Sequence, residues 1–205
     1  MASGHEDRMD RTGVLAEALE SILAGNDLLV LGLPRGGIPI ADGVARTLQA
    51  PLDVLVVRQL EVPGVPDLVL GALAAGRVRE MNPEVTRVIP AELLERLEER
   101  GWGQLEKNER QYRNTRRRPR VRGKQVVLVD DRIGDGTMMR AAIRAARKRG
   151  AAKVIVAAPV ASRQAIAEIE PMADAVVCPL RYEDLRSDDR WTPRSSGDPQ
   201  NGHII

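Results

Sequence analysis

The feature that most limits how this chain can fold is a short valine-rich run over residues 125–129, followed by a glycine turn. Uninterrupted apolar runs of this length are typical of strands that are buried on both faces of a parallel sheet. Gly134, Asp135 and Gly136 form the expected turn, and an alanine- and arginine-rich segment with helical periodicity follows over residues 138–149. This order of strand, turn and helix predicts one unit of an α/β fold.

Further units of the same kind recur along the chain. The other apolar runs, each expected to be a strand, lie at residues 28–33, 52–57, 153–159 and 173–178. Helical patterns lie at residues 12–23, 38–48 and 162–169, the last with Ser162 as its expected N-cap. The repetition predicts an α/β fold with a mainly parallel central sheet, helices on both faces and right-handed crossovers.

Shorter elements interrupt this pattern in the middle of the chain. Brief strand-like runs lie at residues 69–73, 77–79 and 85–88. They predict a small antiparallel excursion, a hood or flap beside the main sheet. A long amphipathic helix is expected from Pro90 to about Tyr112, and Gly101 and Gly103 are the positions at which it could be interrupted.

Two loops in this pattern carry groups suited to binding an anionic ligand. Asp130 and Asp131 directly follow the run over residues 125–129, where the strand is expected to end. Carboxylates there can accept hydrogen bonds from sugar hydroxyls or hold a hydrated Mg²⁺, and amides at the start of the next helix can hold a phosphate. Gly36 and Gly37 give the loop after residue 33 similar properties. Ligands of parallel sheets bind beyond the carboxyl ends of the strands, so both loops are expected to open into one cavity.

The composition argues against several classes of catalytic site. The two histidines, His5 and His203, both lie in polar tails, which disfavours a Ser-His-Asp triad or a histidine-rich zinc site. The chain has no phenylalanine and only 2% aromatic residues, so single-stranded nucleic acid would find few side chains to stack on. The one cysteine, Cys178, allows no internal disulfide, fits a reducing cytoplasm and is expected to be a buried structural thiol.

One domain is expected for a chain of 205 residues. It is expected over residues 12–182, with a disordered N-terminal tail over residues 1–11 and a flexible, polar C-terminal tail over residues 183–205. The sequence shows neither a signal peptide nor an apolar run long enough to span a membrane, so a cytoplasmic protein without membrane contact is expected.

The loop after residue 129 resembles the phosphoribosyl-diphosphate signature of the type I phosphoribosyltransferases, in which two acidic residues precede Thr-Gly-x-Thr. Here the acidic pair is Asp130-Asp131 and the glycine is Gly136. Asp135 and Met138 stand where the family usually has its two threonines, and Thr137 lies one place before the second. The resemblance therefore includes the acids and the turn, with both hydroxyl positions altered.

The loop Pro34-Arg35-Gly36-Gly37 resembles the pyrophosphate-binding loop of a bacterial stand-alone subgroup of the same family. Together the two loops extend the resemblance over roughly residues 12–178. It implies the type I fold, Mg²⁺ as cofactor, and transfer of a phosphoribosyl group between phosphoribosyl diphosphate and a nitrogenous base in nucleotide metabolism.

The resemblance also implies roles for particular residues. Asp130 and Asp131 would hold the ribose hydroxyls and the metal shell, and Asp135 could be a base that activates the incoming nitrogen. The substrate-binding residues would be Arg35, Gly36 and Gly37 for the diphosphate, Gly134, Gly136, Thr137 and Met138 for the 5′-phosphate, and Arg58 as the cation of a flap over residues 58–67. The hood over the base is expected from the C-terminal segment, where Tyr182 or Trp191 could stack on a base.

Two other functions remain open from the sequence. A non-catalytic regulator that kept the fold and binds nucleotides or phosphoribosyl diphosphate would account for the altered threonines. The basic run over residues 108–124 would then suit RNA, although such runs are usually solvated faces or linkers and can also steer a polyphosphate. An unrelated phosphate-binding α/β protein would require both loop matches to be accidental. We favour the transferase over the regulator. Nucleic acid is a possible partner that we do not favour, and the identity of the base and a homodimer are left open.

Overall fold

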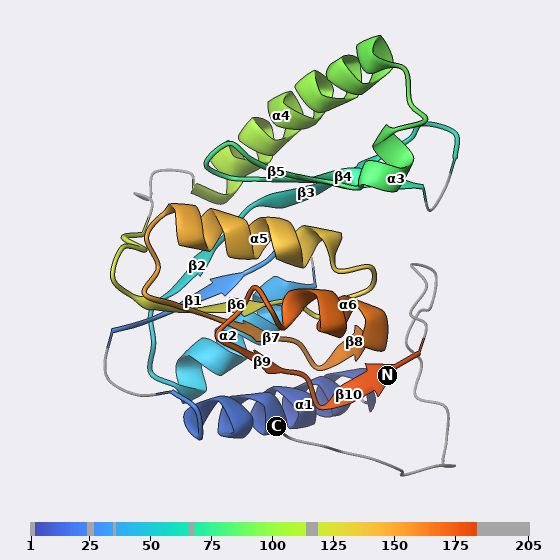
Figure 1. Cartoon of the computed structure of the whole chain (residues 1–205). Coiled ribbons are helices and arrows are strands. Elements are labelled where there is room, and N and C mark those ends of the chain that lie inside the picture. The colour runs from blue at the N-terminus through green and yellow to red at the C-terminus, as the bar shows by residue number, and fades with distance from the viewer. Residues whose placement is uncertain (1–2, 24–26, 35, 66–67, 114–118, 184–205) are drawn as a thin grey trace.

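Five parallel strands form the central sheet of the protein (Figure 1). They are β1 (Leu28–Gly32), β2 (Leu52–Val54), β6 (Gln125–Val129), β7 (Lys153–Ala157) and β9 (Ala175–Val177), in the order β2-β1-β6-β7-β9. β1 and β6 pair over their full length, from Leu28 with Gln125 to Gly32 with Val129. The computed structural model describes residues 3–23, 27–34, 36–65, 68–113 and 119–183. The mainly parallel sheet expected from the apolar runs is confirmed.

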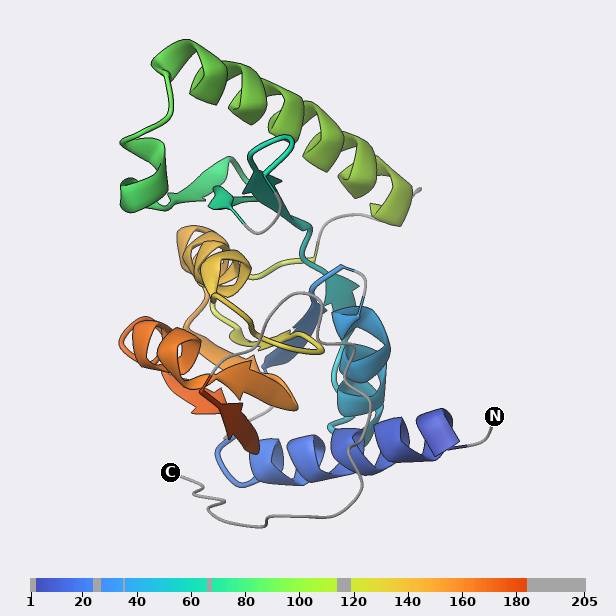
Figure 2. The same ribbon diagram turned by 90° about the vertical axis from the view of Figure 1, so that its right-hand side faces the viewer.

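Helices cover both faces of this sheet, as Figures 1 and 2 show. On one face lie α1 (Ser3–Glu20) and α2 (Gly37–Thr47), and Leu19 and Val44 of these helices share a core with Val30 of β1. On the other face lie α5 (Thr137–Lys148) and α6 (Arg163–Ile169), where Ile143 shares a core with Leu31. Val30 and Leu31 serve different cores because successive strand side chains point to opposite faces.

A second layer lies beyond α5 (Figure 1). The antiparallel strands β3 (Val57–Glu61), β4 (Val69–Ala74) and β5 (Val78–Met81) form a sheet in the order β3-β4-β5. The short α3 (Pro83–Thr86) and the long α4 (Ala91–Arg113) follow, and α4 runs across this sheet on the side away from α5. Leu60, Leu73 and Leu105 belong to the same buried core as Met139 of α5, so the excursion packs directly on the main domain.

The long helix α4 is continuous through both glycines that could have interrupted it. A Cβ atom built on Gly101 would lie 2.5 Å from Leu60 Cδ2 and 2.9 Å from Leu73 Cδ1, whereas one on Gly103 would meet nothing within 4 Å. Gly101 therefore lets the helix approach the small sheet closely. The helix stays continuous because Leu97 and Leu105 are buried on one of its faces, and their packing compensates for the low helix propensity of the two glycines.

The N-terminal helix begins earlier than the expected boundary at residue 12. α1 starts at Ser3, so residues 3–11, expected as part of a disordered tail, are helical. Their polar sequence carries no apolar periodicity, and the helix is anchored further on by Leu15 and Leu19, both with no exposed surface. Once such a turn is fixed, extending a helix costs little. The expected C-terminal tail lies outside the described residues, except for Glu183.

Two further predictions differ from the structure. The run over residues 85–88, expected as a strand, lies in α3 and the turn after it, because the Asn82 side chain caps this helix by accepting a hydrogen bond from the Glu84 N–H at 3.0 Å. The run over residues 52–57 is divided between β2 in the main sheet and β3 in the small sheet. β8 (Val160–Ser162) and β10 (Leu180–Tyr182) form a separate parallel pair that was not predicted.

Among the described helices, none combines the length and apolar character needed to cross a bilayer. Cys178 is buried, as expected, and its thiol donates a hydrogen bond to the carbonyl of Leu180 at 3.2 Å. Burial raises the pKa of this thiol to about 11, so at neutral pH it is not the thiolate that reacts.

Candidate functional site

The strand order places the carboxyl ends of β1 and β6 at a switch point of the sheet. From β1 the chain moves outward to β2, and the later strands β7 and β9 extend the sheet from β6 in the opposite direction. Open α/β sheets bind ligands in the crevice beyond such a point, because the connections that leave the two strands diverge. Gly36 and Gly37 follow β1, and Asp130 and Asp131 follow β6, so both predicted anion loops start from neighbouring strands.

The two loops are in direct contact. A Cβ atom built on Gly36 would overlap the carboxylate of Asp131, and one on Gly37 would lie 2.7 Å from the carbonyl oxygen of Val129 and 2.9 Å from Asp130 Cα. The backbone N–H of Leu33 donates to the same Val129 carbonyl at 2.9 Å. Glycine is thus required here by close approach and not by a left-handed backbone, since Gly36 has φ −71° and ψ −30°. Arg35, a predicted ligand of the diphosphate, lies outside the described residues.

The two acids occupy different environments. Asp130 is 5% exposed, and its Oδ1 accepts a hydrogen bond from the backbone N–H of Asp131 at 2.8 Å, whereas Asp131 is exposed. Burial, followed by the charge of Asp131, raises the pKa of Asp130 well above its usual 3.8. The pair therefore consists of an inner carboxyl that tends to keep its proton and an outer carboxylate that faces solvent.

The glycine turn that follows has the geometry of a helix start whose first amide is already occupied. Gly136 has φ +76°, a conformation that glycine adopts without strain. The exposed Asp135 carboxylate accepts a hydrogen bond from the backbone N–H of Thr137 at 3.0 Å. The turn thus places a negative charge of the chain itself where amides would hold a phosphate.

The side chain of Thr137 faces the protein. It is 3% exposed, and its hydroxyl oxygen accepts a hydrogen bond from Arg140 Nη2 at 3.1 Å. Met138, predicted to lie at the phosphate, is half-buried and lines a cavity on the side of α4. The hydroxyl of Thr137 is therefore bonded within α5, to Arg140. Met138 lies at the cavity beside α4.

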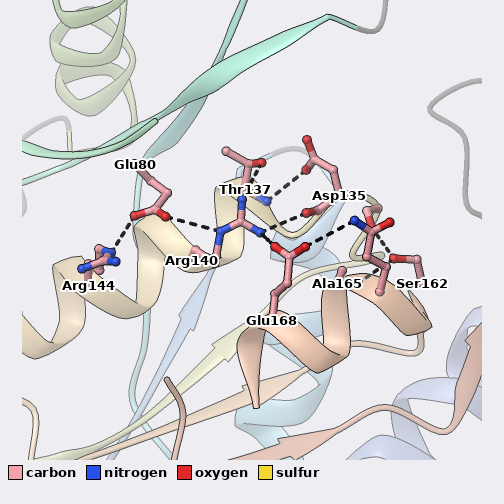
Figure 3. A network of polar contacts seen from close by, with 10 residues as sticks. Glu80, Asp135, Thr137, Arg140, Arg144, Ser162, Ala165 and Glu168 are labelled. Carbon is pink, nitrogen blue, oxygen red and sulfur yellow. Dashed lines mark hydrogen bonds and ion pairs between the residues drawn. The ribbon is translucent and has the colours of Figure 1, made fainter. Parts of the chain in front are cut away.

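Arg140 connects this turn to the second layer (Figure 3). Its Nη1 donates to the carbonyl oxygen of Asp135 at 3.2 Å and pairs with Glu168 of α6, and its Nε lies 3.4 Å from Glu80 Oε1 of β5. Arg144, one turn further along α5, pairs with the other oxygen of Glu80 at 2.6 Å. Sequence reasoning missed this network; the spacing of Arg140 and Arg144 puts them on one helix face, but nothing in the sequence indicates Glu80 as their partner.

Ser162, at the start of α6, holds the glycine turn over residues 134–136 by a hydrogen bond. Its hydroxyl accepts from the backbone N–H of Ala165 at 3.0 Å, which confirms the predicted N-cap of α6, and donates to the carbonyl oxygen of Gly134 at 2.6 Å (Figure 3). The backbone of the loop is also paired with β8, because the Ile133 N–H donates to the Val160 carbonyl at 3.0 Å. The turn over residues 133–137 is therefore held on both sides by ordered elements.

Arg58 lies on β3, within a strand and not in a loop as expected. Together with Pro34 and Met138 it lines a cavity of about 1150 Å³ between the small sheet, α4 and the two loops. The Nε atom of Arg58 is buried and has no hydrogen-bond partner among the described residues. The structure thus brings Arg58 to the same side of the molecule as the glycine loops.

Other predicted participants are elsewhere or structural. Tyr182 is exposed on β10, and Trp191 lies outside the described residues. Of the basic run, Arg113 ends α4 and pairs with Asp53 at 3.1 Å and with Glu109 at 3.4 Å, while residues 114–118 lie outside the described residues. Within the described ranges there is no group of three or more side chains that could hold a metal ion.

The family described as the phosphoribosyl transferase domain matches residues 8–185 of this chain. A protein of Mycobacterium tuberculosis strain H37Rv, provisionally named a phosphoribosyl transferase, is 41% identical over 175 residues. The match includes 84% of this chain and 39% of that protein, so the chain spans about two fifths of the length of this relative.

Solved structures show the same architecture. TT1426 from Thermus thermophilus is 37% identical, with a TM-score of 0.72 over 88% of this chain and 86% of that one. A purine phosphoribosyltransferase from Pyrococcus horikoshii has a TM-score of 0.50 at 18% identity, over 86% of this chain and 83% of that one. The second likeness is one of fold alone.

Proposed function

This chain belongs to the phosphoribosyl transferase domain family, and from that premise we propose that it transfers a phosphoribosyl group between phosphoribosyl diphosphate and a nitrogenous base. The observation that carries the proposal is the contact between Gly36 and Asp131. It joins an amide-rich loop that suits a diphosphate to an acidic pair that suits ribose hydroxyls, at the point of the sheet where ligands of such folds bind.

In the proposed reaction the bond between ribose C1 and the diphosphate oxygen breaks, and a bond from C1 to the nitrogen of the base forms. The diphosphate leaves with the electron pair. Backbone amides at Gly36 and Gly37, with Arg35 and Arg58, would hold the leaving group. Asp131 and Asp130 would hold the ribose and stabilise the positive charge that develops on it. Asp135 is the candidate base that removes the proton of the incoming nitrogen. The 5′-phosphate would bind at the amides of Gly134, Gly136, Thr137 and Met138, and for this the Asp135 carboxylate would have to release the Thr137 N–H that it accepts from.

The two aspartates could hold Mg²⁺ together with a bound diphosphate, although only Asp131 is exposed. Mg²⁺ usually takes one or two carboxylates together with the phosphates of a substrate, and Asp130 and Asp131 offer that number. Asp131 is the exposed member, whereas Asp130 has a raised pKa and would have to lose its proton. When bound with the ligand, the ion would neutralise charge on the diphosphate. A cytoplasmic protein of nucleotide metabolism is the setting we propose.

The test is pyrophosphate release and ligand binding in the same preparation. Protein, Mg²⁺ and phosphoribosyl diphosphate are mixed with a panel of purine and pyrimidine bases, and released pyrophosphate is measured. Asp131→Asn is expected to weaken Mg²⁺-dependent binding of the diphosphate at least about ten-fold, with little change in unfolding free energy. Asp42→Asn is the control, because Asp42 is a surface residue of α2 that pairs with Arg46. If Asp131→Asn lost diphosphate binding and stability to the same extent, the aspartate would have a structural role and the proposal would be wrong.

A second candidate function is a non-catalytic regulator that binds nucleotides or phosphoribosyl diphosphate. The observation that favours it is the Asp135 carboxylate, which occupies the Thr137 amide and opposes a phosphate there. Tight diphosphate binding without pyrophosphate release for any base would support the regulator over the transferase.

A further inference from the structure

The cavity between the small sheet and α4 has a polar wall that the proposed chemistry at the glycine loops does not use. Its walls are β3 with the turn after it, and one side of α4. Pro34 and Met138 form its boundary on the side of the main domain. Since these two residues flank the glycine loops, the cavity opens directly beside the candidate site.

Helix α4 carries two adjacent stripes along this part of its length (Figure 2 shows its course above the main domain). Leu97, Gly101 and Leu105 are buried against the small sheet. Arg100, Gln104 and Asn108 follow at intervals of four residues and line the cavity. Residues four apart lie on one face of a helix, so this polar stripe is directed into the cavity as a continuous row.

The lining contains more hydrogen-bond donors than acceptors. Arg58 and Arg100 both line the cavity, and neither is joined by an ion pair or hydrogen bond to another described residue. The Arg58 Nε is buried, whereas Arg100 is exposed at the open side of the cavity. Among the described residues of this lining, Glu61 is the one carboxylate, and it is exposed. The buried Arg58 N–H without an acceptor is costly, and the exposed Arg100 adds a second positive charge to the same lining, so a ligand that supplies acceptor atoms and negative charge would be favoured.

We propose that this cavity is the acceptor pocket and that it selects a nitrogenous acceptor bearing a carboxylate group. The proposal rests on the transferase function and names the class of its second substrate. Arg100 pairs with the carboxylate, and the carboxamides of Gln104 and Asn108 bind the polar edge of the ring. The proposed acceptor pocket is formed by α4 and the small sheet. The C-terminal segment expected to form the hood lies outside the described residues after Glu183. Arg58 remains assigned to the diphosphate. Arg100 is therefore the residue that is substituted in the test.

The experiment compares matched pairs of small acceptors by isothermal titration calorimetry, with the full chain, Mg²⁺ and pyrophosphate present. Nicotinate is paired with nicotinamide, and orotate with uracil, so that each pair differs in a carboxylate. We expect the carboxylated member of at least one pair to bind at least about five-fold more tightly, as one ion pair would give. Arg100→Gln should abolish that difference and leave the affinity for pyrophosphate unchanged. Arg96→Gln, a change at an exposed residue one turn earlier on α4 and outside the lining, should leave both unchanged.

Equal affinities within both pairs, no binding of any of the four acceptors, or a preference that survives Arg100→Gln would overturn the proposal. The outcomes separate it from the transferase function. Pyrophosphate release with neutral bases alone would retain the transferase and remove the carboxylate pocket. Carboxylate-selective binding that depends on Arg100, without pyrophosphate release, would retain the pocket and remove the transferase.

Discussion

The carboxylate of Asp135 accepts a hydrogen bond from the backbone N–H of Thr137 at 3.0 Å, at the start of α5. This places a fixed negative charge at the amides that would hold a 5′-phosphate. Asp135→Asn keeps an oxygen for the Thr137 N–H and removes the charge. We expect the variant to bind ribose 5-phosphate about five-fold or more tightly than the wild type, since removing about 1 kcal/mol of repulsion has that effect. Calorimetry with ribose 5-phosphate measures it.

Asp135→Ala extends the same test, because it removes both the charge and the hydrogen bond. It should also bind ribose 5-phosphate more tightly than the wild type, at a cost of about 1 kcal/mol in unfolding free energy for the lost cap. If Asp135 is the base of the reaction, Asp135→Asn will tighten phosphate binding and reduce turnover together. Weaker binding of ribose 5-phosphate by Asp135→Asn would mean that the carboxylate assists the ligand, contrary to this prediction.

The contact between Gly36 and Asp131 gives a second prediction. Alanine adopts the backbone angles of Gly36 without strain, so Gly36→Ala should fold with a free energy of unfolding within about 1 kcal/mol of the wild type. Its new methyl group would displace the Asp131 carboxylate. We therefore expect Mg²⁺-dependent pyrophosphate binding to fall about ten-fold or more. Gly13→Ala is the control, since a Cβ there meets nothing within 4 Å. Unchanged affinity in Gly36→Ala would show that the two loops act independently.

The main sheet could be predicted from the sequence because its determinants are local. Apolar runs such as the one at residues 28–33, each followed by a turn and a helical pattern, are sufficient for a parallel sheet. Determinants that depend on packing were missed. Residues 3–11 have no apolar periodicity, and their helix is continuous with the packed turns around Leu15. Val85 and Val88 suggest a strand from composition, yet Asn82 and Pro83 start a helix there.

The candidate site shows the same division. The acidic pair and the glycine loops were found because each is a short contiguous string, and their contact follows from the order of the strands. The pairing of Arg140 with Glu80 joins residues from different layers, and no spacing in the sequence indicates it. The cavity beside α4 was also missed, because its polar stripe is indistinguishable from a solvated helix face until the small sheet is placed beneath it.

Gly101 and Gly103 give a matched pair of substitutions on one helix. Gly101→Ala would force a methyl group into Leu60 and Leu73, which should lower the free energy of unfolding by about 1–3 kcal/mol. Gly103→Ala adds a methyl group in open space and should raise it by about 0.5–1 kcal/mol through helix propensity. Each kcal/mol corresponds to about 2–4 °C in Tm for a chain of this size, which thermal unfolding resolves. Stabilisation by both substitutions would show that α4 does not pack on the small sheet as closely as described.

The raised pKa of Asp130 predicts how stability changes with pH. Because burial holds this pKa above the usual 3.8, the native state binds a proton that the unfolded state has already lost over the interval between the two values. Stability from this residue is therefore present at low pH and is lost as pH rises through the folded pKa.

Asp130→Asn has no such charge, and its Oδ1 can still accept a hydrogen bond from the Asp131 N–H. We expect the stability of the variant relative to the wild type to grow as pH rises above the usual carboxyl pKa of 3.8, because only the wild type must then ionise a buried carboxyl group. Urea unfolding at several pH values measures the difference, with Asp42→Asn as a surface control whose difference should stay nearly constant. A difference between the variant and the wild type that stays constant or shrinks as pH rises would mean that burial does not hold the Asp130 pKa above its usual value.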